Sequence, residues 1–594
     1  MEVRGETPFR LLFTLAATLT LAQSNPTPFV NQPLAPESAK PGSSGFVLTV
    51  NGTGFVSAST VVWNGSARST QFVSSSQLTA TISASDVAKA AMASVTVVSP
   101  PPGGGSSNVV DFVIRNASKR VPFAPDLVAR LEPGAVAVAD FNSDGELDVA
   151  IAWWDGAYKS GGVDVYLGNG DGTFAHKPIR TEVFVQAATV SAWLQVADFN
   201  ADGKPDIAFN RLDGDGNDPP YGVILLGNGD GTFTVTNNSY VLASPAVGDI
   251  NGDGLPDFVT TGGAAAWDGQ CGTEIYLAKA GRTYTISAGF GQGCANDAGY
   301  GEGAALGDFN HDGKLDVAVI CSALPKGQGG CVTSGAGVLV ALGNGDGTFQ
   351  PPVYYGTANG ASVITAADLN GDGNLGLVTD GVCTLLGNGD GTFKPATCSS
   401  PVNTAGTMVL GDFNGDGKLD VALLSYSSSS YFINVYLGKG DGTFASPLIY
   451  PAPVGAGVSL AAGDFNNDGR TDLVVGSADG VTNAVVFLQT VAGVSPTSIA
   501  FGNQPVGKKS PPRTVTFTND KAFSLKINHI QIVGNNSNEF QQTNNCGPTL
   551  PAGGSCQIKV RFQPNTRGRA AADIVVRYDG TGGPQTAPLS GTGT

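Results

Sequence analysis

One nine-residue pattern of aspartate, asparagine and glycine recurs seven times in this sequence. The copies follow D-x-N-x-D-G-x-x-D, lie 44 to 60 residues apart and begin at Asp140, Asp198, Asp249, Asp308, Asp368, Asp412 and Asp464. Calcium prefers six to eight oxygen ligands from carboxylates, amide and backbone carbonyls and water. The glycine at position 6 of each copy allows the chain to turn sharply. Each copy is therefore predicted to be a calcium-binding loop.

The predicted ligands alternate along the loop. Side chains at positions 1, 3, 5 and 9 and the backbone carbonyl at position 7 can point to one centre. In the fifth copy Gly376 replaces the closing aspartate, so a weaker site is expected there. The predicted metal-ligating residues are Asp140, Asn142, Asp144, Glu146, Asp148, Asp198, Asn200, Asp202, Lys204, Asp206, Asp249, Asn251, Asp253, Leu255, Asp257, Asp308, Asn310, Asp312, Lys314, Asp316, Asp368, Asn370, Asp372, Asn374, Asp412, Asn414, Asp416, Lys418, Asp420, Asp464, Asn466, Asp468, Arg470 and Asp472.

These loops differ from an EF-hand and from a catalytic metal site. An EF-hand needs a glutamate at position 12, whereas the first copy has Ile151 there. Magnesium is the weaker candidate because it prefers fewer protein ligands and more water. Seven near-identical loops do not resemble one active site with an open coordination position. We therefore expect about six to seven structural Ca2+ ions and no catalytic residues.

The net charge of the chain fits this interpretation. The chain carries a formal charge of −17, and 20 of its aspartates belong to the repeated pattern. Seven Ca2+ ions would nearly cancel that charge. A nucleic-acid partner is not expected, because a phosphate-binding surface needs a basic patch.

The elements around each loop are predicted to be short strands. In the first copy, apolar runs at 135–141, 147–153 and 163–167 are followed by a further strand at 173–179. A second signature, L-G-[NK]-G-D-G-T-F, turns the chain before that last strand at Leu167, Leu226, Leu342, Leu386 and Leu437. Four antiparallel strands every ~50 residues are typical of a propeller blade. Position 2 of each loop is apolar and is predicted to pack between blades.

The ends of the repeat region predict how the ring closes. The seventh copy runs out at Leu488 without a G-D-G-T-F turn, whereas residues 121–128, before the first copy, resemble the missing outer strand. We expect residues 121–128 to complete blade seven, which would remove an open sheet edge.

The repeats resemble the FG-GAP/VCBS family, whose best-known members form the propeller of the integrin α-subunit. The resemblance covers about 370 residues, and the family's metal positions fall on positions 1, 3, 5, 7 and 9 of each loop. It implies a calcium-stabilised, seven-bladed β-propeller over residues 117–490.

Two further β-domains flank the repeats. The string GTGFVSASTVVWNGSARSTQFVSSSQLTATISASDV, within residues 25–116, resembles the IPT/TIG immunoglobulin-like domain. The strings FGNQPVGKKSPPRTVTFTND and CGPTLPAGGSCQIKVRFQP, within residues 491–594, resemble the ASH-type immunoglobulin-like domain. The predicted fold is all-β: a seven-bladed β-propeller flanked by two immunoglobulin-like β-sandwiches.

The N-terminus and the cysteines predict export. Residues 1–22 have two arginines and then an apolar run, which is typical of a cleaved signal peptide and too short for a membrane span. No later stretch is apolar enough to cross a membrane. Disulfides are favoured over a zinc site, because the spacing lacks C-x2-C and the chain has three histidines. We expect a secreted or surface-associated protein with disulfides among Cys271, Cys294, Cys321, Cys331, Cys383, Cys398, Cys546 and Cys556.

Specificity is expected on the face opposite the calcium loops, where the variable loops lie. Aromatic side chains beside acids there suit stacking against sugars. The candidates are Trp153, Trp154, Asp155, Tyr158, Tyr221 and Trp267, although the two adjacent tryptophans could instead cap the sheet.

The leading hypothesis is an adhesion or binding protein for an extracellular carbohydrate or a surface protein. The alternatives are a propeller-based polysaccharide lyase or hydrolase, and a passive envelope scaffold. An enzyme would need an acid, a base and a cation converging on the variable face, whereas a scaffold would have no pocket there and no affinity for glycans.

Overall fold

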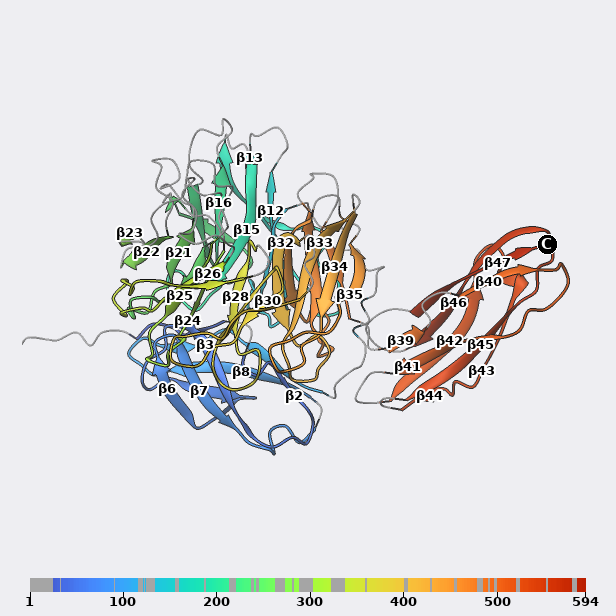
Figure 1. Cartoon of the computed structure of the whole chain (residues 1–594), viewed down its shortest axis with the longest axis horizontal. Coiled ribbons are helices and arrows are strands. Elements are labelled where there is room, and N and C mark those ends of the chain that lie inside the picture. Colours follow the sequence, from blue (N-terminus) through green and yellow to red (C-terminus); the bar gives the residue numbers. More distant parts are fainter. Residues whose placement is uncertain are drawn as a thin grey trace, which may run out of the picture.

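A computed structural model describes the chain over residues 25–31, 34–89, 91–115, 121, 123, 134–154, 160–185, 189–212, 221–236, 240–241, 245–261, 273–279, 283–287, 303–321, 337–357, 361–399, 404–427, 430–452, 454, 457–477, 484–489, 492–495, 499–519, 524–551, 554–578 and 585–594. These residues form an N-terminal sandwich, a ring of small sheets and a C-terminal sandwich (Figure 1). The predicted signal segment, residues 1–22, lies outside them. Within the described residues, no helix has the length and apolar character needed to span a membrane.

The N-terminal domain packs two sheets face to face, one antiparallel and one in which β2 pairs with β10 in parallel. Its core is centred on Trp63 and Phe112, whose ring centroids are 5.0 Å apart. One sheet has the order β1 (Phe29–Val30), β3 (Phe46–Thr53), β7 (Gln77–Ile82) and β6 (Thr70–Ser74). The other has the order β2 (Ser38–Ala39), β10 (Val110–Ile114), β8 (Ala91–Ser99), β4 (Thr60–Trp63) and β5 (Ser66–Ala67), with β9 (Gly105–Ser106) beside β8.

Seven sheets follow within the described part of the chain, one for each repeat. The first three are β11 (Val136–Ala139), β12 (Asp148–Trp154), β13 (Ser160–Tyr166), β14 (Ile179–Val185); β15 (Thr189–Ala197), β16 (Asp206–Leu212), β17 (Tyr221–Gly227), β18 (Phe233–Val235) with β19 (Tyr240–Val241); and β20 (Ala246–Gly248), β21 (Asp257–Thr261), β22 (Thr273–Lys279), β23 (Thr283–Ser287). In each sheet the aspartate-rich nine-residue loop joins the first strand to the second.

The remaining four sheets repeat this order. They are β24 (Ala304–Gly307), β25 (Asp316–Cys321), β26 (Gly337–Ala341), β27 (Val353–Gly356); β28 (Ile364–Ala367), β29 (Gly376–Thr379), β30 (Cys383–Leu385), β31 (Thr397–Cys398); β32 (Thr404–Gly411), β33 (Asp420–Ser427), β34 (Ser430–Tyr436), β35 (Leu448–Ala452); and β36 (Gly457–Gly463), β37 (Asp472–Ser477), β38 (Val485–Phe487). The seven sheets are the blades of a propeller, which confirms the predicted fold class.

Apolar side chains at position 2 of the loops pack between adjacent blades, as predicted. Phe141 of blade one lies 5.7 Å from Phe233 of blade two, measured between ring centroids. Phe465 of blade seven meets Phe174 of blade one in the same way, also at 5.7 Å. This second pair joins the last blade to the first and closes the ring.

Phe123 completes blade seven. It forms an antiparallel bridge with Gln489, as Phe174 does with Gly168 in blade one. Its ring contacts Phe487 of its own blade and Phe413 of blade six, each at a centroid distance of 6.5 Å. Phe123 therefore takes the place of the missing turn phenylalanine, which confirms at this residue the predicted closure by residues 121–128.

The C-terminal domain is a second sandwich, set apart from the ring in Figure 1. Its core includes Phe517, Phe540, Phe562 and Ile574. One sheet has the order β39 (Ala492–Ser495), β41 (Arg513–Asn519), β45 (Ser555–Phe562) and β43 (Phe540–Asn544), and β43 follows the short 3-10 helix η2 (Ser537–Glu539). The other has the order β40 (Ile499–Gln504), β47 (Gln585–Gly593), β46 (Gly568–Tyr578), β42 (Leu525–Val533) and β44 (Thr549–Leu550).

Two of the predicted cysteine couples are disulfides. Cys383 pairs with Cys398 across adjacent strands of blade five, and Cys546 pairs with Cys556 in the C-terminal sandwich. Cys271, Cys294 and Cys331 lie outside the described residues, as does the side chain of Cys321 at the end of β25. Couples formed by these four stay predictions.

Candidate metal centres of the propeller

Each repeated loop folds around its first aspartate. In blade one, Asp140 Oδ1 accepts a hydrogen bond from the backbone N–H of Asp144 at 3.1 Å, and Oδ2 accepts one from Gly145 at 2.9 Å. Asn142 and Asp144 in turn accept bonds from backbone N–H groups two residues ahead, at 3.0 and 2.8 Å. Gly145 has φ +92°, which a side chain would disfavour. Oxygens from positions 1, 3 and 5 are thus held within one tight turn.

The aspartate at position 9 ties two turns together. Asp148 Oδ2 accepts the N–H of Phe141, at position 2 of its own loop, at 2.8 Å, and Oδ1 accepts the N–H of Gly168, in the next turn of the blade, at 2.8 Å. The same two-way bonding recurs at Asp206, Asp257, Asp316 and Asp472. In blade six Asp420 makes the same two-way link, but its first donor is Asn414 at position 3 of the loop. All six side chains are fully buried. Position 9 is therefore a structural link as well as a predicted ligand.

Burial of these carboxylates raises their pKa values. Desolvation raises the pKa of Asp148 to about 7 and that of Asp206 to about 8, against the lowering effect of the backbone N–H bonds. The negative charges at positions 1 and 5 of the same loop raise both values further. Desolvation likewise raises the pKa of Asp257 to about 7, of Asp316 to about 6, of Asp420 to about 8, and of Asp472 well above its usual range. Each complete loop thus concentrates negatively charged carboxylates in a buried site, where desolvation disfavours their ionised form.

The donor set of these loops fits a hard divalent cation. Within the described residues, no group of three or more aspartate, glutamate, histidine or cysteine side chains is arranged to hold a metal by itself. The predicted set is mixed, however, because position 3 supplies an amide oxygen and position 7 a backbone carbonyl. Carboxylate and carbonyl oxygens are the ligands that Ca2+ prefers. A cation would also offset the repulsion that the buried aspartates carry.

Blade five lacks the position-9 link. Asp368 still accepts backbone N–H bonds from Gly371 and Gly373, at 2.8 and 2.9 Å, so the turn itself is kept. Gly376 begins β29 at the point where the other blades have a buried carboxylate. The loop therefore has one carboxylate fewer, as the sequence indicated.

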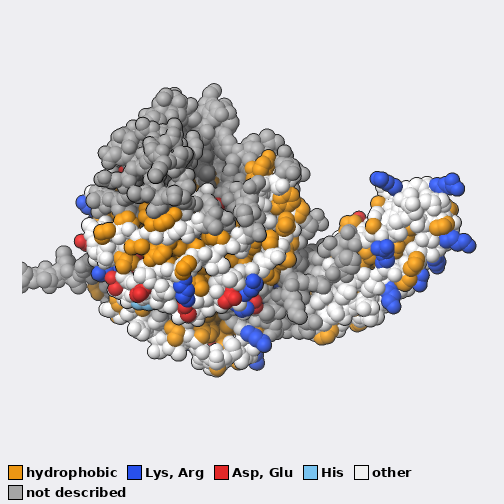
Figure 2. Space-filling view, in the orientation of Figure 1, with side chains coloured by type: hydrophobic (Ala, Val, Ile, Leu, Met, Phe, Trp, Pro, Cys, Tyr) orange, Lys and Arg blue, Asp and Glu red, His pale blue; other side chains and the backbone are white. Residues whose placement is uncertain are grey.

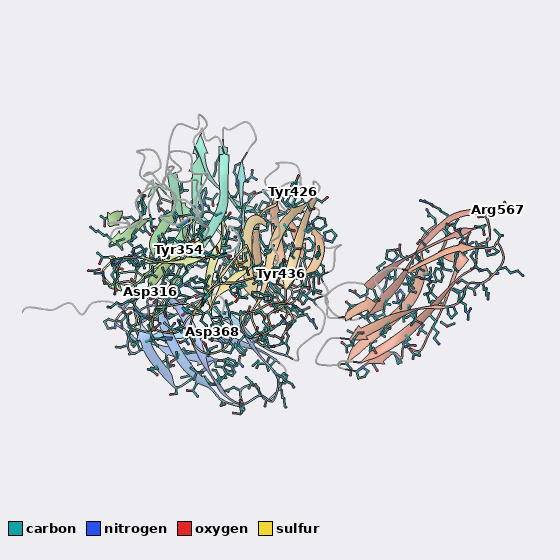
Figure 3. All side chains as sticks on the ribbon, in the orientation of Figure 1. Asp316, Tyr354, Asp368, Tyr426, Tyr436 and Arg567 are labelled. Atoms are coloured by element: carbon teal, nitrogen blue, oxygen red, sulfur yellow. A yellow bond between two sulfur atoms is a disulfide. The ribbon has the colours of Figure 1, made fainter. Side chains whose placement is uncertain are left out.

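The N-terminal sandwich contacts the loops of five blades. Its residues Pro26, Thr27, Val73, Val113 and Arg115 lie next to the loop glycines of blades two, three, four, six and seven. Figure 3 shows Asp316 and Asp368 at the end of the propeller that faces this domain. Sequence analysis did not predict this contact, because the partners are far apart along the chain.

The closest contact surrounds Asp412 of blade six. Glu37 accepts the backbone N–H of Asp412 at 2.7 Å, Arg115 Nη2 donates to its carbonyl at 2.8 Å, and the Ser38 hydroxyl bonds its carboxylate. Burial, followed by the nearby Asp412 charge, raises the pKa of Glu37 to about 8. Three residues that sequence analysis missed thus join the two domains at one loop.

A cavity of about 930 Å³ runs along the axis of the ring. Its walls are the first strands of the seven blades, and residues of the N-terminal sandwich, including Phe29, Glu37, Asp111 and Arg115, line one end. Trp193 of β15, which sequence analysis did not select, also lines it. The N-terminal sandwich therefore covers the loop end of the axial cavity.

The structure corrects the predicted ligand-stacking role of one residue, Trp153. Trp153 is 6% exposed, and the Arg180 guanidinium lies 3.9 Å from the centre of its ring. Arg180 is itself held by Asp164 at 2.8 and 2.6 Å. Trp153 therefore packs inside blade one instead of presenting its ring to a ligand. Asp155, Tyr158 and Trp267, and the side chains of Trp154 and Tyr221, lie outside the described residues.

The fold and the loops define a β-propeller whose blades carry aspartate-rich turns. Residues 140–209 and 412–475 match the family model for the FG-GAP-like repeat, and residues 493–592 match that for the HYDIN/CFA65/VesB-like Ig-like domain. The chain therefore carries FG-GAP-like repeats and a C-terminal HYDIN/VesB-like Ig-like domain. No curated protein matches the chain. The IPT/TIG resemblance of the N-terminal sandwich stays a prediction.

Several solved structures are similar to parts of the chain. BBS1N, crystallised in complex with ARL6DN, is 11% identical over 64% of this chain and 98% of its own, with a TM-score of 0.35. An auxiliary nutrient binding protein from Bacteroides ovatus is 14% identical over 77% of this chain and 97% of its own, with a TM-score of 0.27. The ASH/PapD-like domain 7 of human CEP192 is 18% identical over 18% of this chain and 86% of its own, with a TM-score of 0.15.

Proposed function

We propose that this protein is an exported, calcium-stabilised propeller that binds a carbohydrate or a protein ligand at the cell surface. The observation that carries the calcium assignment is the buried aspartate repeated in six blades, with its raised pKa and its two backbone bonds. Calcium would supply positive charge at each loop. The loop residues hold oxygens in one turn and link that turn to the next.

Export is supported by the cysteines. The disulfides Cys383–Cys398 and Cys546–Cys556 are typical of proteins from oxidising compartments. Together with the signal-like segment at residues 1–22, they favour a secreted or surface-associated location.

The ligand face is proposed to be the face opposite the loops. The N-terminal sandwich lies on the loop face and covers that end of the axial cavity. At the other end, Tyr426 of β33 and Tyr431 of β34 face each other across the hairpin, with ring centroids 5.0 Å apart. Tyr426 is 44% exposed and lies at the end of the propeller away from the N-terminal domain (Figure 3).

The exposed ring of Tyr426, beside half-buried Tyr431, suits sugar recognition. One face of a sugar ring stacks on an aromatic ring, while neighbouring hydroxyl and amide groups bond its hydroxyls. In the same hairpin the buried Asn434 donates through Nδ2 to the buried Ser425 hydroxyl at 2.5 Å, which holds β34 against β33. We propose binding rather than catalysis, because the buried aspartates of the loops recur from blade to blade and are bonded to backbone N–H groups.

A glycan array with the calcium-loaded, signal-free protein tests this function. The expected result is binding to one class of glycan, weakened at least tenfold in the Tyr426→Ala variant. Phe72→Ala is the matched control, because Phe72 is an exposed aromatic residue of the N-terminal sandwich and its loss should leave the affinity unchanged. Equal affinity of wild type and Tyr426→Ala for the bound glycan would contradict the assignment of this face.

A further inference from the structure

The C-terminal domain differs sharply in charge from the rest of the chain. Residues 491–594 contain ten lysines and arginines and four aspartates and glutamates, a formal charge of +6. Since the whole chain carries −17, the first 490 residues carry −23. The C-terminal sandwich is thus a basic domain attached to an acidic protein. Figure 2 shows lysine and arginine side chains over its visible face.

Six of the ten basic residues gather at one end of the sandwich. Lys508 and Lys509 lie in the loop between β40 and β41, and Arg567 lies in the turn between β45 and β46. Gly507 N–H donates to the Pro564 carbonyl at 2.8 Å, and Gln563 Nε2 donates to the Gly507 carbonyl at 3.0 Å. These bonds place the loop and the turn side by side.

The strands that leave this loop and turn bring the other three basic residues to the same end. Arg513 begins β41, Arg561 lies at the end of β45, and Arg569 follows the first residue of β46. Arg513 pairs with Val560, the neighbour of Arg561, in the register of β41 and β45. We call this group of six the basic tip: Lys508, Lys509, Arg513, Arg561, Arg567 and Arg569. Figure 3 shows Arg567 at the far end of the domain.

The charges of the basic tip are not neutralised within the described residues. All six residues are exposed, and none forms an ion pair with a described aspartate or glutamate. Of the domain's described acids, Glu539 is buried and Asp573 lies half-buried in the middle of β46. The tip therefore presents a concentrated positive surface to solvent.

Part of the tip is pre-ordered. Arg561 Nη1 donates to the Ser510 carbonyl at 2.9 Å, and the Arg513 guanidinium lies 5.8 Å from the centre of the Phe501 ring. Ordering before binding lowers the entropy that a ligand contact would otherwise cost. Arginine forks match carboxylate, sulfate and phosphate groups with paired hydrogen bonds.

We propose that the basic tip of the C-terminal sandwich binds an anionic polysaccharide. The surroundings favour a sugar polymer over single-stranded nucleic acid: the exposed neighbours include Asn565, Thr566 and Gln541, which can bond sugar hydroxyls. The large apolar side chain exposed near the tip is Val506, and no exposed aromatic ring is found among the described residues of this domain for bases to stack on. This site is separate from the proposed ligand face of the propeller.

The test measures binding of the full signal-free protein, in calcium, to polygalacturonate and dextran sulfate, with neutral dextran as the blank. Wild type should bind a charged polymer and not dextran, with affinity that falls as salt rises. Arg567→Glu/Arg569→Glu should weaken binding at least tenfold. Lys526→Glu/Arg577→Glu, at exposed positions of the same domain outside the tip, is the matched control and should change binding less than threefold.

Three outcomes would overturn the proposal. Equal weakening by both variants would mean that net charge alone causes binding. Tighter binding to duplex DNA or to phosphatidylglycerol vesicles than to either polymer would assign the tip to another partner. No binding to either polymer by the folded wild-type protein, with its C-terminal thermal transition intact, would also refute it. Preference for polygalacturonate or for dextran sulfate would identify the anionic group.

Discussion

In six blades a buried aspartate joins the first turn of the blade to the next, whereas blade five has Gly376 at that position. Blade five has instead the disulfide Cys383–Cys398, which joins its third and fourth strands directly. The carboxylate link carries a desolvation cost that shows in the raised pKa values, and a cation would offset it. The disulfide carries no charge and needs no ion.

This difference shows that the repeated pattern has two separable parts. Positions 1 to 6 form the turn, since blade five keeps the backbone bonds to Asp368 without an aspartate at position 9. Position 9 links that turn to the rest of the blade and adds negative charge. The ion is therefore expected to matter most where position 9 is an aspartate, which the following predictions examine.

The largest effect is expected from breaking the position-9 link. In Asp206→Asn the new amide N–H2 would face one of the two backbone N–H donors, Phe199 or Gly227, and leave it unpaired. We expect a loss of about 2–3 kcal/mol of propeller stability in calcium, by denaturant unfolding. Asp230→Asn, in the exposed turn of the same blade, is the matched control and should cost much less stability than Asp206→Asn. Equal losses of stability for the two variants would contradict the claim that the aspartate at position 9 links the two turns.

Removing the disulfide of blade five should lower the stability of the propeller by a comparable or slightly smaller amount. Cys383→Ser/Cys398→Ser opens a loop with a sequence separation of 15, for which about 3 kcal/mol is expected at most. The loss should be the same with and without calcium, because the link carries no charge. Cys546→Ser/Cys556→Ser is the control and should lower only the transition of the C-terminal sandwich. A calcium-dependent loss in the blade-five variant would contradict the comparison.

The pH dependence of stability should change sign with calcium. The folded pKa values of Asp148, Asp206 and Asp420 are raised to between about 7 and about 8, above the ~3.9 of an unfolded aspartate. Between those values the folded state holds more protons than the unfolded state, so metal-free protein should gain stability as pH falls from 8 to 5. In calcium the aspartates are ionised in the folded state. The calcium-loaded protein should therefore lose stability as the pH is lowered from 8 to 5. Melting temperatures of protein stripped of metal on a chelating resin, measured from pH 8 to pH 5, test this prediction. A metal-free protein whose melting temperature falls as the pH is lowered would contradict it.

The smallest effect is expected from restoring the missing aspartate. A Cβ at residue 376 would lie 2.9 Å from the Leu385 carbonyl oxygen, so the backbone must shift to accept it. Gly376→Asp should tighten calcium binding at blade five, by calorimetric titration, with a stability gain below about 1 kcal/mol. Gly376→Ala adds the same Cβ without the carboxylate. If both variants bind calcium alike, position 9 is not a ligand.

Much of this architecture is readable in the sequence because it depends on local spacing. The loops, the turns, the position-2 packing and the closure at Phe123 all follow from patterns within one repeat. The role of Asp148 as a link to Gly168 needs a partner 20 residues away, which the pattern does not reveal. Glu37 and Arg115 are further still from Asp412, and nothing in their local sequence marks them. For Trp153 the sequence left both ligand stacking and packing open, and it could not decide between them because Arg180, which covers its ring, comes from another strand.

The central claim is that calcium stabilises the propeller through the loops with an aspartate at position 9. The most direct test is thermal unfolding of the signal-free protein with calcium and with EGTA, together with metal analysis after dialysis. The account predicts six or seven bound ions per chain and a rise of more than ~10 °C in the melting temperature of the propeller. No bound calcium and an unchanged melting temperature would contradict it.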